Sequence, residues 1–103
     1  MTDDEFLGAL ERCELPAFGH AEHVRAAYLY LSKAGFEEAL ENVRRSLRRY
    51  VAHLGKADRY DDAMTSAYME LIHQRMAERG AGGGWAAFAR ANADLFSMRL
   101  AGT

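Results

Sequence analysis

The sequence predicts an all-α protein, a small helical bundle of four main helices with up-and-down connections and a short C-terminal helix. Half of the 103 residues are hydrophobic and only one is proline, which favours long uninterrupted helices. Apolar residues recur at the 3.6-residue helical period in four stretches, and no stretch alternates as a strand would. Segments with glycine or proline separate these stretches. For a chain of this length we expect a single domain, 1–103.

The first expected helix begins at Thr2. Its opening segment, Thr2-Asp3-Asp4-Glu5, matches a capping box, in which the first and last of these side chains bind free backbone amides at the helix start. We expect this helix to end at Leu15, because the residue before a proline is pushed out of the α region. Cys13 falls in register with the apolar residues of this helix and is expected to be a buried small hydrophobe.

The second expected helix spans residues 20–33, with Gly35 as its C-terminal cap. It is apolar on more than one side, which is typical of a central helix or of one at a subunit contact. The third spans residues 36–54 and carries one apolar stripe, with glutamates at its start and arginines at its end, as the helix dipole favours. We expect the arginines Arg44, Arg45, Arg48 and Arg49 to form a solvated helix end.

The fourth expected helix spans residues 60–79. Four glycines among residues 80–84 then predict a flexible link. A short helix from Trp85 to about residue 91 follows. The tail after it is apolar enough to pack on the rest of the protein, through Leu95, Phe96, Met98 and Leu100.

The candidate site starts from two histidines, His20 and His23, which stand three residues apart where the second helix begins. At this spacing their β-carbons lie about 5–6 Å apart on one helix face. Short connections make the second, third and fourth helices antiparallel neighbours. The second and fourth helices therefore start at the same end of the bundle, where Asp61 and Asp62 should join the histidines.

These four residues suit metal or acid–base chemistry. A helix N-terminus carries partial positive charge, which favours the neutral imidazole that a metal ligand or a general base needs. Two histidines with one carboxylate suit Zn(II), Fe(II) or Mn(II), so His20, His23 and Asp61 are the expected ligands of a divalent metal. Asp62 would orient an imidazole or cap the helix. As catalytic residues we expect His20, His23, Asp61 and Asp62.

Three further residues are candidates for substrate binding. Arg25 lies about one turn beyond the histidines and could hold a carboxylate or phosphate. Thr65 could donate or accept a hydrogen bond, and Tyr60 could form a wall of the site. Tyr28, Tyr30 and Tyr68 could line the same pocket, but aromatic residues at helical spacing are more often part of the core, so Tyr60 is the strongest of the tyrosines. The remaining histidines are expected outside the site, His53 on a polar face and His73 partly buried with a hydrogen-bond partner.

The segment from Phe18 to Leu31 resembles a signature of small, uncharacterised all-helical bacterial proteins, F-x-H-x-x-H-V-R-x-A-x-x-Y-L. A second segment of that family, Y-H-E-T-x-T, is similar to residues 60–65 here, with Tyr60 and Thr65 matching and Asp61 in the place of a histidine. Residues 85–88 and 92–95 resemble its W-x-x-F and N-P-D-L segments, so the resemblance covers about residues 18–96. It implies a metal or acid–base cluster and carries no known activity.

Composition limits the partners. The net charge of −2 gives no general attraction to nucleic acid. No apolar run is long enough to cross a membrane, and the acidic N-terminal segment differs from a signal peptide, so we expect a cytoplasmic protein. The leading hypothesis is an enzyme or ligand-binding protein for a polar small molecule. The alternative is a non-enzymatic interaction module with structural histidines, and the two-sided second helix also predicts a homodimer.

Overall fold

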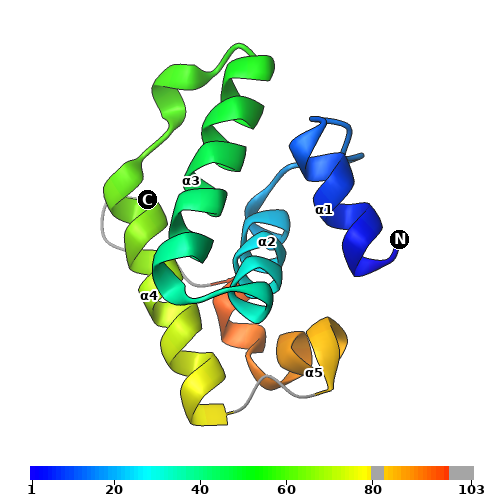
Figure 1. The fold of residues 1–103 in the computed structure, drawn as a ribbon, viewed down its shortest axis with the longest axis vertical. Coiled ribbons are helices and arrows are strands. Elements are labelled where there is room, and N and C mark those ends of the chain that lie inside the picture. Colours follow the sequence, from blue (N-terminus) through cyan, green and yellow to red (C-terminus); the bar gives the residue numbers. More distant parts are fainter. Residues whose placement is uncertain (80–82, 98–103) are drawn as a thin grey trace.

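The computed structural model describes residues 1–79 and 83–97. This part of the chain contains five α-helices and two short 3-10 helices and no strand, which confirms the all-α prediction. Their bounds are α1 Asp3–Glu11, α2 His20–Lys33, α3 Phe36–His53, η1 Ala57–Arg59, α4 Asp62–Arg79, α5 Gly84–Ala91 and η2 Ala93–Phe96. Figure 1 shows α3 and α4 side by side and running in opposite directions, with α2 foreshortened beside them. The finer prediction, a bundle of four up-and-down helices, is not confirmed.

Helix α2 lies at the centre of the molecule. It packs against α1, α3, α4, α5 and η2. The segment 26–31 is buried without a break, which explains why α2 is apolar on more than one side. The pattern predicted either a central helix or one at a subunit contact, and the structure agrees with the first, because other elements of the same chain cover α2. No helix in the described residues is both long enough and apolar enough to span a membrane.

Helix α1 ends earlier than the sequence predicts. The capping box at Thr2 is present, but the helix stops at Glu11, before the proline is reached. The amides of Cys13 and Glu14 bind the carbonyls of Leu10 (3.1 Å) and Ala9 (2.8 Å), and Cys13 has a φ of 58°. This is the Schellman arrangement, with a cysteine at the left-handed position that glycine usually takes. Cys13 is half-buried against the core rather than fully buried.

Gly35 also differs from its predicted role. Its φ is −67°, and it is the N-terminal cap of α3 rather than a left-handed C-terminal cap of α2. Helix α2 ends at Lys33, and its C-terminal cap is Ala34, whose backbone is extended. Gly55, which follows the C-terminal cap of α3, does take the left-handed conformation, with a φ of 73°.

The C-terminal segment packs onto α2. Leu95 in η2 has no exposed surface, and Phe88 in α5 is also buried. Trp85 in α5 and Phe96 in η2 are partly buried against the same core. Of the predicted tail, Leu95 and Phe96 therefore pack as expected. Gly83 and Gly84 have φ values of 87° and 80°. The rest of the predicted glycine link, 80–82, and the tail residues Met98 and Leu100 lie outside the described part.

Candidate functional site

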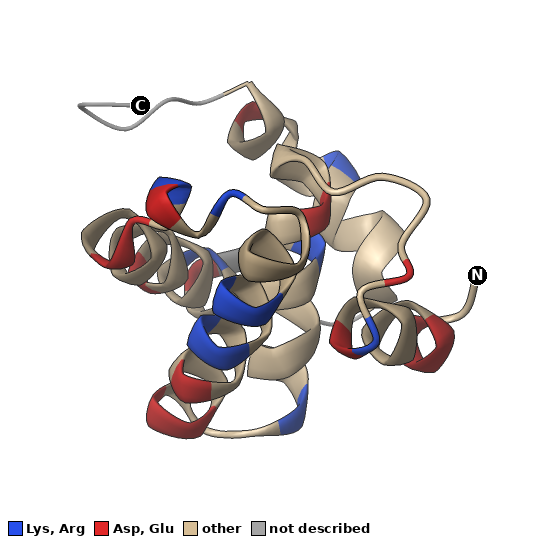
Figure 2. Ribbon diagram, turned by 90° about the horizontal axis from the view of Figure 1, so that it is seen from above, with Lys and Arg blue, Asp and Glu red and all other residues tan. Residues whose placement is uncertain are grey.

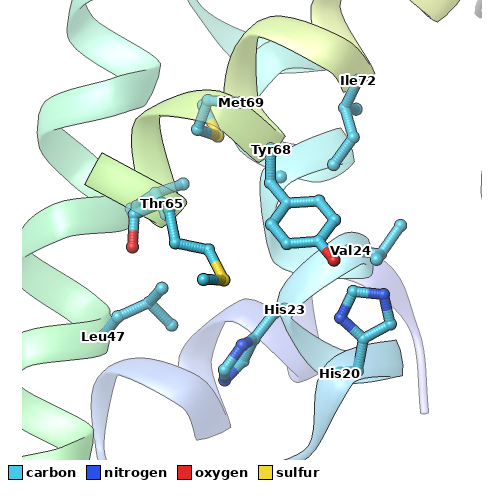
Figure 3. A pocket seen from close by; sticks show the side chains of 11 residues that line it. His20, His23, Val24, Leu47, Thr65, Tyr68, Met69 and Ile72 are labelled. Carbon is cyan, nitrogen blue, oxygen red and sulfur yellow. The ribbon is translucent and has the colours of Figure 1, made fainter. Parts of the chain in front are cut away.

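A cavity of about 320 Å³ lies between α2, α3 and α4. Figure 3 shows it from close by. Within residues 1–79 and 83–97, its polar lining consists of two imidazoles and two hydroxyl-bearing side chains, with no lysine, arginine, aspartate or glutamate. The polar residues are His20, His23, Thr65 and Tyr68, and the apolar ones are Val24, Ala27, Val43, Leu47, Met64, Met69 and Ile72. Three of the seven predicted site residues, His20, His23 and Thr65, thus meet at one cavity.

His23 is the most unusual group in this cavity. Its Nε2 atom is buried and has no hydrogen-bond partner. The ring packs edge-on against Phe18, with 4.6 Å between ring centroids. Burial, and secondarily the nearby His20, lower the pKa of His23 from 6.5 to about 4. The imidazole is therefore neutral at pH 7, as the sequence predicted, although the main cause is burial rather than the helix N-terminus.

His20 is held in a different way. Its Nε2 atom lies 2.6 Å from the backbone carbonyl oxygen of Leu95 in η2. Because a carbonyl oxygen only accepts hydrogen bonds, Nε2 must carry the proton. The ring also packs against Tyr68, with 5.1 Å between centroids. In Figure 3 the His20 ring points toward Tyr68, and the His23 ring extends to the other side.

Asp62 does not face the cavity. Its carboxylate receives two hydrogen bonds from Arg44, at 2.9 and 3.2 Å, and one from the Tyr60 hydroxyl at 2.8 Å. The hydrogen bonds from Tyr60 and then Arg44 lower the pKa of Asp62. Arg48 lies over the ring of Tyr60, 5.0 Å from its centroid. The predicted orienting residue Asp62 and the predicted wall residue Tyr60 therefore join α4 to α3 and are not among the lining residues.

Asp61 caps the N-terminus of α4. Its carboxylate accepts a hydrogen bond from the Met64 amide at 3.0 Å, and its carbonyl accepts one from the Thr65 hydroxyl at 2.9 Å. Helix α4 therefore starts at Asp62, not at Tyr60, with Asp61 as its N-terminal cap. Within residues 1–79 and 83–97, no three side chains of histidine, cysteine, aspartate or glutamate gather closely enough to hold a metal. The predicted ligand set of His20, His23 and Asp61 is not assembled.

Arg25 also lies away from the cavity. Its guanidinium group contacts the carboxylate of Asp3 at 3.3 Å and sits 4.5 Å from the ring centroid of Phe6. Both partners belong to α1, so Arg25 joins α2 to α1. The predicted role of Arg25 in substrate binding has no support from this position.

Two parts of the site were not among the seven predicted site residues: Tyr68, which was only a weaker candidate, and the carbonyl of Leu95. Tyr68 lies one turn after Thr65 on α4, and this spacing is a signal that could have ranked Tyr68 above Tyr60. The carbonyl of Leu95 has no signal in the sequence, because a backbone group looks the same at every position. The other histidines lie outside the cavity: His53 is exposed as expected, and His73 is exposed beside Phe36 rather than partly buried.

Comparison of the chain with protein-family models, with curated protein sequences and with solved structures found no match. The resemblance to the F-x-H-x-x-H-V-R family stays a prediction.

Proposed function

We propose that this protein binds a small organic molecule in the cavity between α2, α3 and α4, with His23 as its polar anchor. The observation that carries the proposal is the buried Nε2 atom of His23, which has no hydrogen-bond partner and belongs to a residue that lines the cavity. A buried polar atom without a partner costs about 1–3 kcal/mol. A bound molecule would supply the missing partner.

The dimensions and lining of the cavity support this proposal. Its volume of about 320 Å³ falls at the lower end of the range of about 300–1,000 Å³ that is usual for ligand pockets. Such pockets are mostly apolar with a few polar groups that fix the orientation of the ligand. The mixture of apolar side chains, two histidines, Thr65 and Tyr68 has this character.

Binding is favoured over acid–base catalysis. A general base works best when its pKa lies near the operating pH, and the pKa of His23 is lowered to about 4. His23 is therefore a weak base at neutral pH, although its nitrogen still forms hydrogen bonds. The Nε2 atom of His20 is already engaged with Leu95. We accordingly propose a ligand-binding protein and include no metal in the proposal.

The alternative of a dimerisation module is less favoured. It depended on the two apolar faces of α2, which pack against other elements of the same chain. Among the described residues, the large hydrophobic side chains with substantial exposure are Met1 (64%) and Leu54 (46%). The homodimer stays a prediction, which sedimentation equilibrium would test.

A titration followed by two-dimensional ¹H–¹⁵N NMR tests the proposed function. The wild-type protein would be mixed with a set of small organic compounds, both charged and uncharged. We expect saturable shifts for amides of the cavity residues with some of them. The cavity-filling variant Ala27→Leu should abolish these shifts, because Ala27 is buried and lines the cavity.

The matched control is Ala67→Leu, which adds the same atoms at an exposed position of α4. This variant should bind as the wild type does. If no compound shifts the cavity amides, or if a folded Ala27→Leu variant binds as well as the wild type, the proposed function is wrong.

A further inference from the structure

We infer that the ligand is an uncharged molecule with an apolar body and a hydroxyl group, and that this hydroxyl hydrogen-bonds to Nε2 of His23. The inference rests on the proposed function, because it names the chemical class of molecule for the same cavity. It also revises the expectation of a polar ligand.

The lining excludes a charged ligand. Among the described residues, no lysine, arginine, aspartate or glutamate lines the cavity, and its buried imidazole, His23, is neutral. A charged group that enters such a site loses its hydration without gaining a counter-charge, which costs several kcal/mol. The net binding energy of a charged molecule would therefore be low.

The starts of the two nearby helices do not attract an anion either. A helix N-terminus usually favours negative charge, and α2 and α4 both begin beside the cavity. At α2 the carboxylate of Glu22 already accepts a hydrogen bond from the Gly19 amide, at 2.7 Å. At α4 the carboxylate of Asp61 caps the Met64 amide. An anionic ligand would meet negative charge at both helix starts.

The polar groups of the cavity select a hydroxyl. A neutral imidazole carries one donor nitrogen and one acceptor nitrogen. A hydroxyl both donates and accepts, so it pairs with Nε2 of His23 in either tautomer. The hydrogen of the Thr65 hydroxyl is directed to the carbonyl of Asp61, so Thr65 offers its lone pairs to a donor. The hydroxyl of a ligand can donate its hydrogen to these lone pairs, whereas an ether or a ketone has no hydrogen to donate.

The apolar part of the lining determines the rest of the ligand. Val24, Leu47 and Ile72 give branched aliphatic surface, and Met64 and Met69 give flexible thioether side chains. Methionine adapts to irregular shapes and contacts aromatic rings favourably. A compact aromatic or aliphatic body would bury against these side chains, and its single hydroxyl would face His23.

Three compounds with the same ring and methyl group test this inference: p-cresol, toluene and 4-methylbenzoate. The first carries a hydroxyl, the second carries no polar group, and the third is negatively charged at pH 7. In NMR titrations of the wild type at pH 7, we expect p-cresol to bind about tenfold more tightly than toluene, which corresponds to ~1.4 kcal/mol. We expect 4-methylbenzoate to cause no shifts at the cavity.

The variant His23→Leu should remove the preference for p-cresol over toluene. Its continued binding of toluene would show that the cavity is still formed. The control His53→Leu replaces an exposed histidine on α3 and should keep the tenfold preference.

Equal binding of p-cresol and toluene by the wild type would overturn the inference, and so would a lack of cavity shifts with p-cresol. Tighter binding of 4-methylbenzoate at the cavity would also overturn the ligand class, but it would leave the binding function standing. Failure of the binding function itself is recognised separately, by the behaviour of Ala27→Leu with the broader set of compounds.

Discussion

Replacing His23 by leucine should stabilise the protein, and the gain should grow as the pH falls from 6.5 to 4. The folded protein keeps His23 neutral until the pH reaches its pKa of about 4, whereas the unfolded chain takes up the proton near pH 6.5. Between these values the unfolded state binds more protons, so the free energy of unfolding decreases as the pH falls. At about 1.36 kcal/mol per pKa unit, the full loss in the wild type is about 3 kcal/mol.

Urea denaturation at a series of pH values from about 4 to 7.5 measures this difference. The fluorescence of the single tryptophan, Trp85, or far-UV circular dichroism would follow unfolding. The free energy of unfolding of His23→Leu minus that of the wild type should increase toward acid pH by about 3 kcal/mol and level off below pH 4. Other acidic groups titrate in both proteins, and the subtraction removes their contribution.

The same variant should also be at least as stable as the wild type at pH 7. Leucine fills a similar volume and leaves no buried nitrogen without a partner, so it removes a cost of about 1–3 kcal/mol. His53→Leu replaces an exposed histidine and shows whether the loss of any imidazole has the same effect. Parallel pH curves for the wild type and His23→Leu would refute the reasoning, because they would mean that the folded protein protonates His23 as readily as the unfolded chain does.

Two further substitutions test the contacts around the site. Asp62→Ala removes the acceptor of Arg44 and should lower the melting temperature more at low salt than at high salt. Asp58→Ala, in the exposed η1 turn, is its control, and equal effects of the two variants would contradict this account. Tyr50→Phe removes the hydroxyl that bonds both the amide and the carbonyl of Leu15 and should cost about 1–2 kcal/mol in urea denaturation. A loss below about 0.5 kcal/mol would show that these backbone groups find other partners.

The helices could be predicted because their signals are local. The apolar period places α2 and α3 correctly, and the capping box at Thr2 identifies the start of α1. The end of α1 could not be predicted in this way, because Cys13 takes a left-handed conformation that glycine usually supplies. Its position follows from how the next segment packs, since the hydroxyl of Tyr50 on α3 holds the backbone of Leu15. A contact across 35 residues has no local signature.

The charged residues of the predicted site do not line the cavity, for a similar reason. Asp61, Asp62 and Arg25 have side chains that suit catalysis, and helix order does bring the start of α4 close to the start of α2. Residue type and helix order do not determine which neighbour each side chain meets. Arg44 on α3 binds Asp62, and Asp3 on α1 binds Arg25. Asp62 and Arg25 are thus used in packing between helices, and Asp61 caps α4. The polar groups that line the cavity in the described part of the chain are uncharged.

His20 and His23 lie three residues apart on α2 but contact different parts of the chain. Residues three apart on a helix share a face, yet their directions still differ by about 60° around the axis. In a central helix such as α2, that angle is enough for each side chain to meet a different element. His20 meets η2, a segment 75 residues later in the chain, whereas His23 meets Phe18 in the preceding loop. The two histidines therefore have different roles. His20 bonds the C-terminal segment to the wall of the cavity, and His23 has the nitrogen without a partner that a ligand would bind.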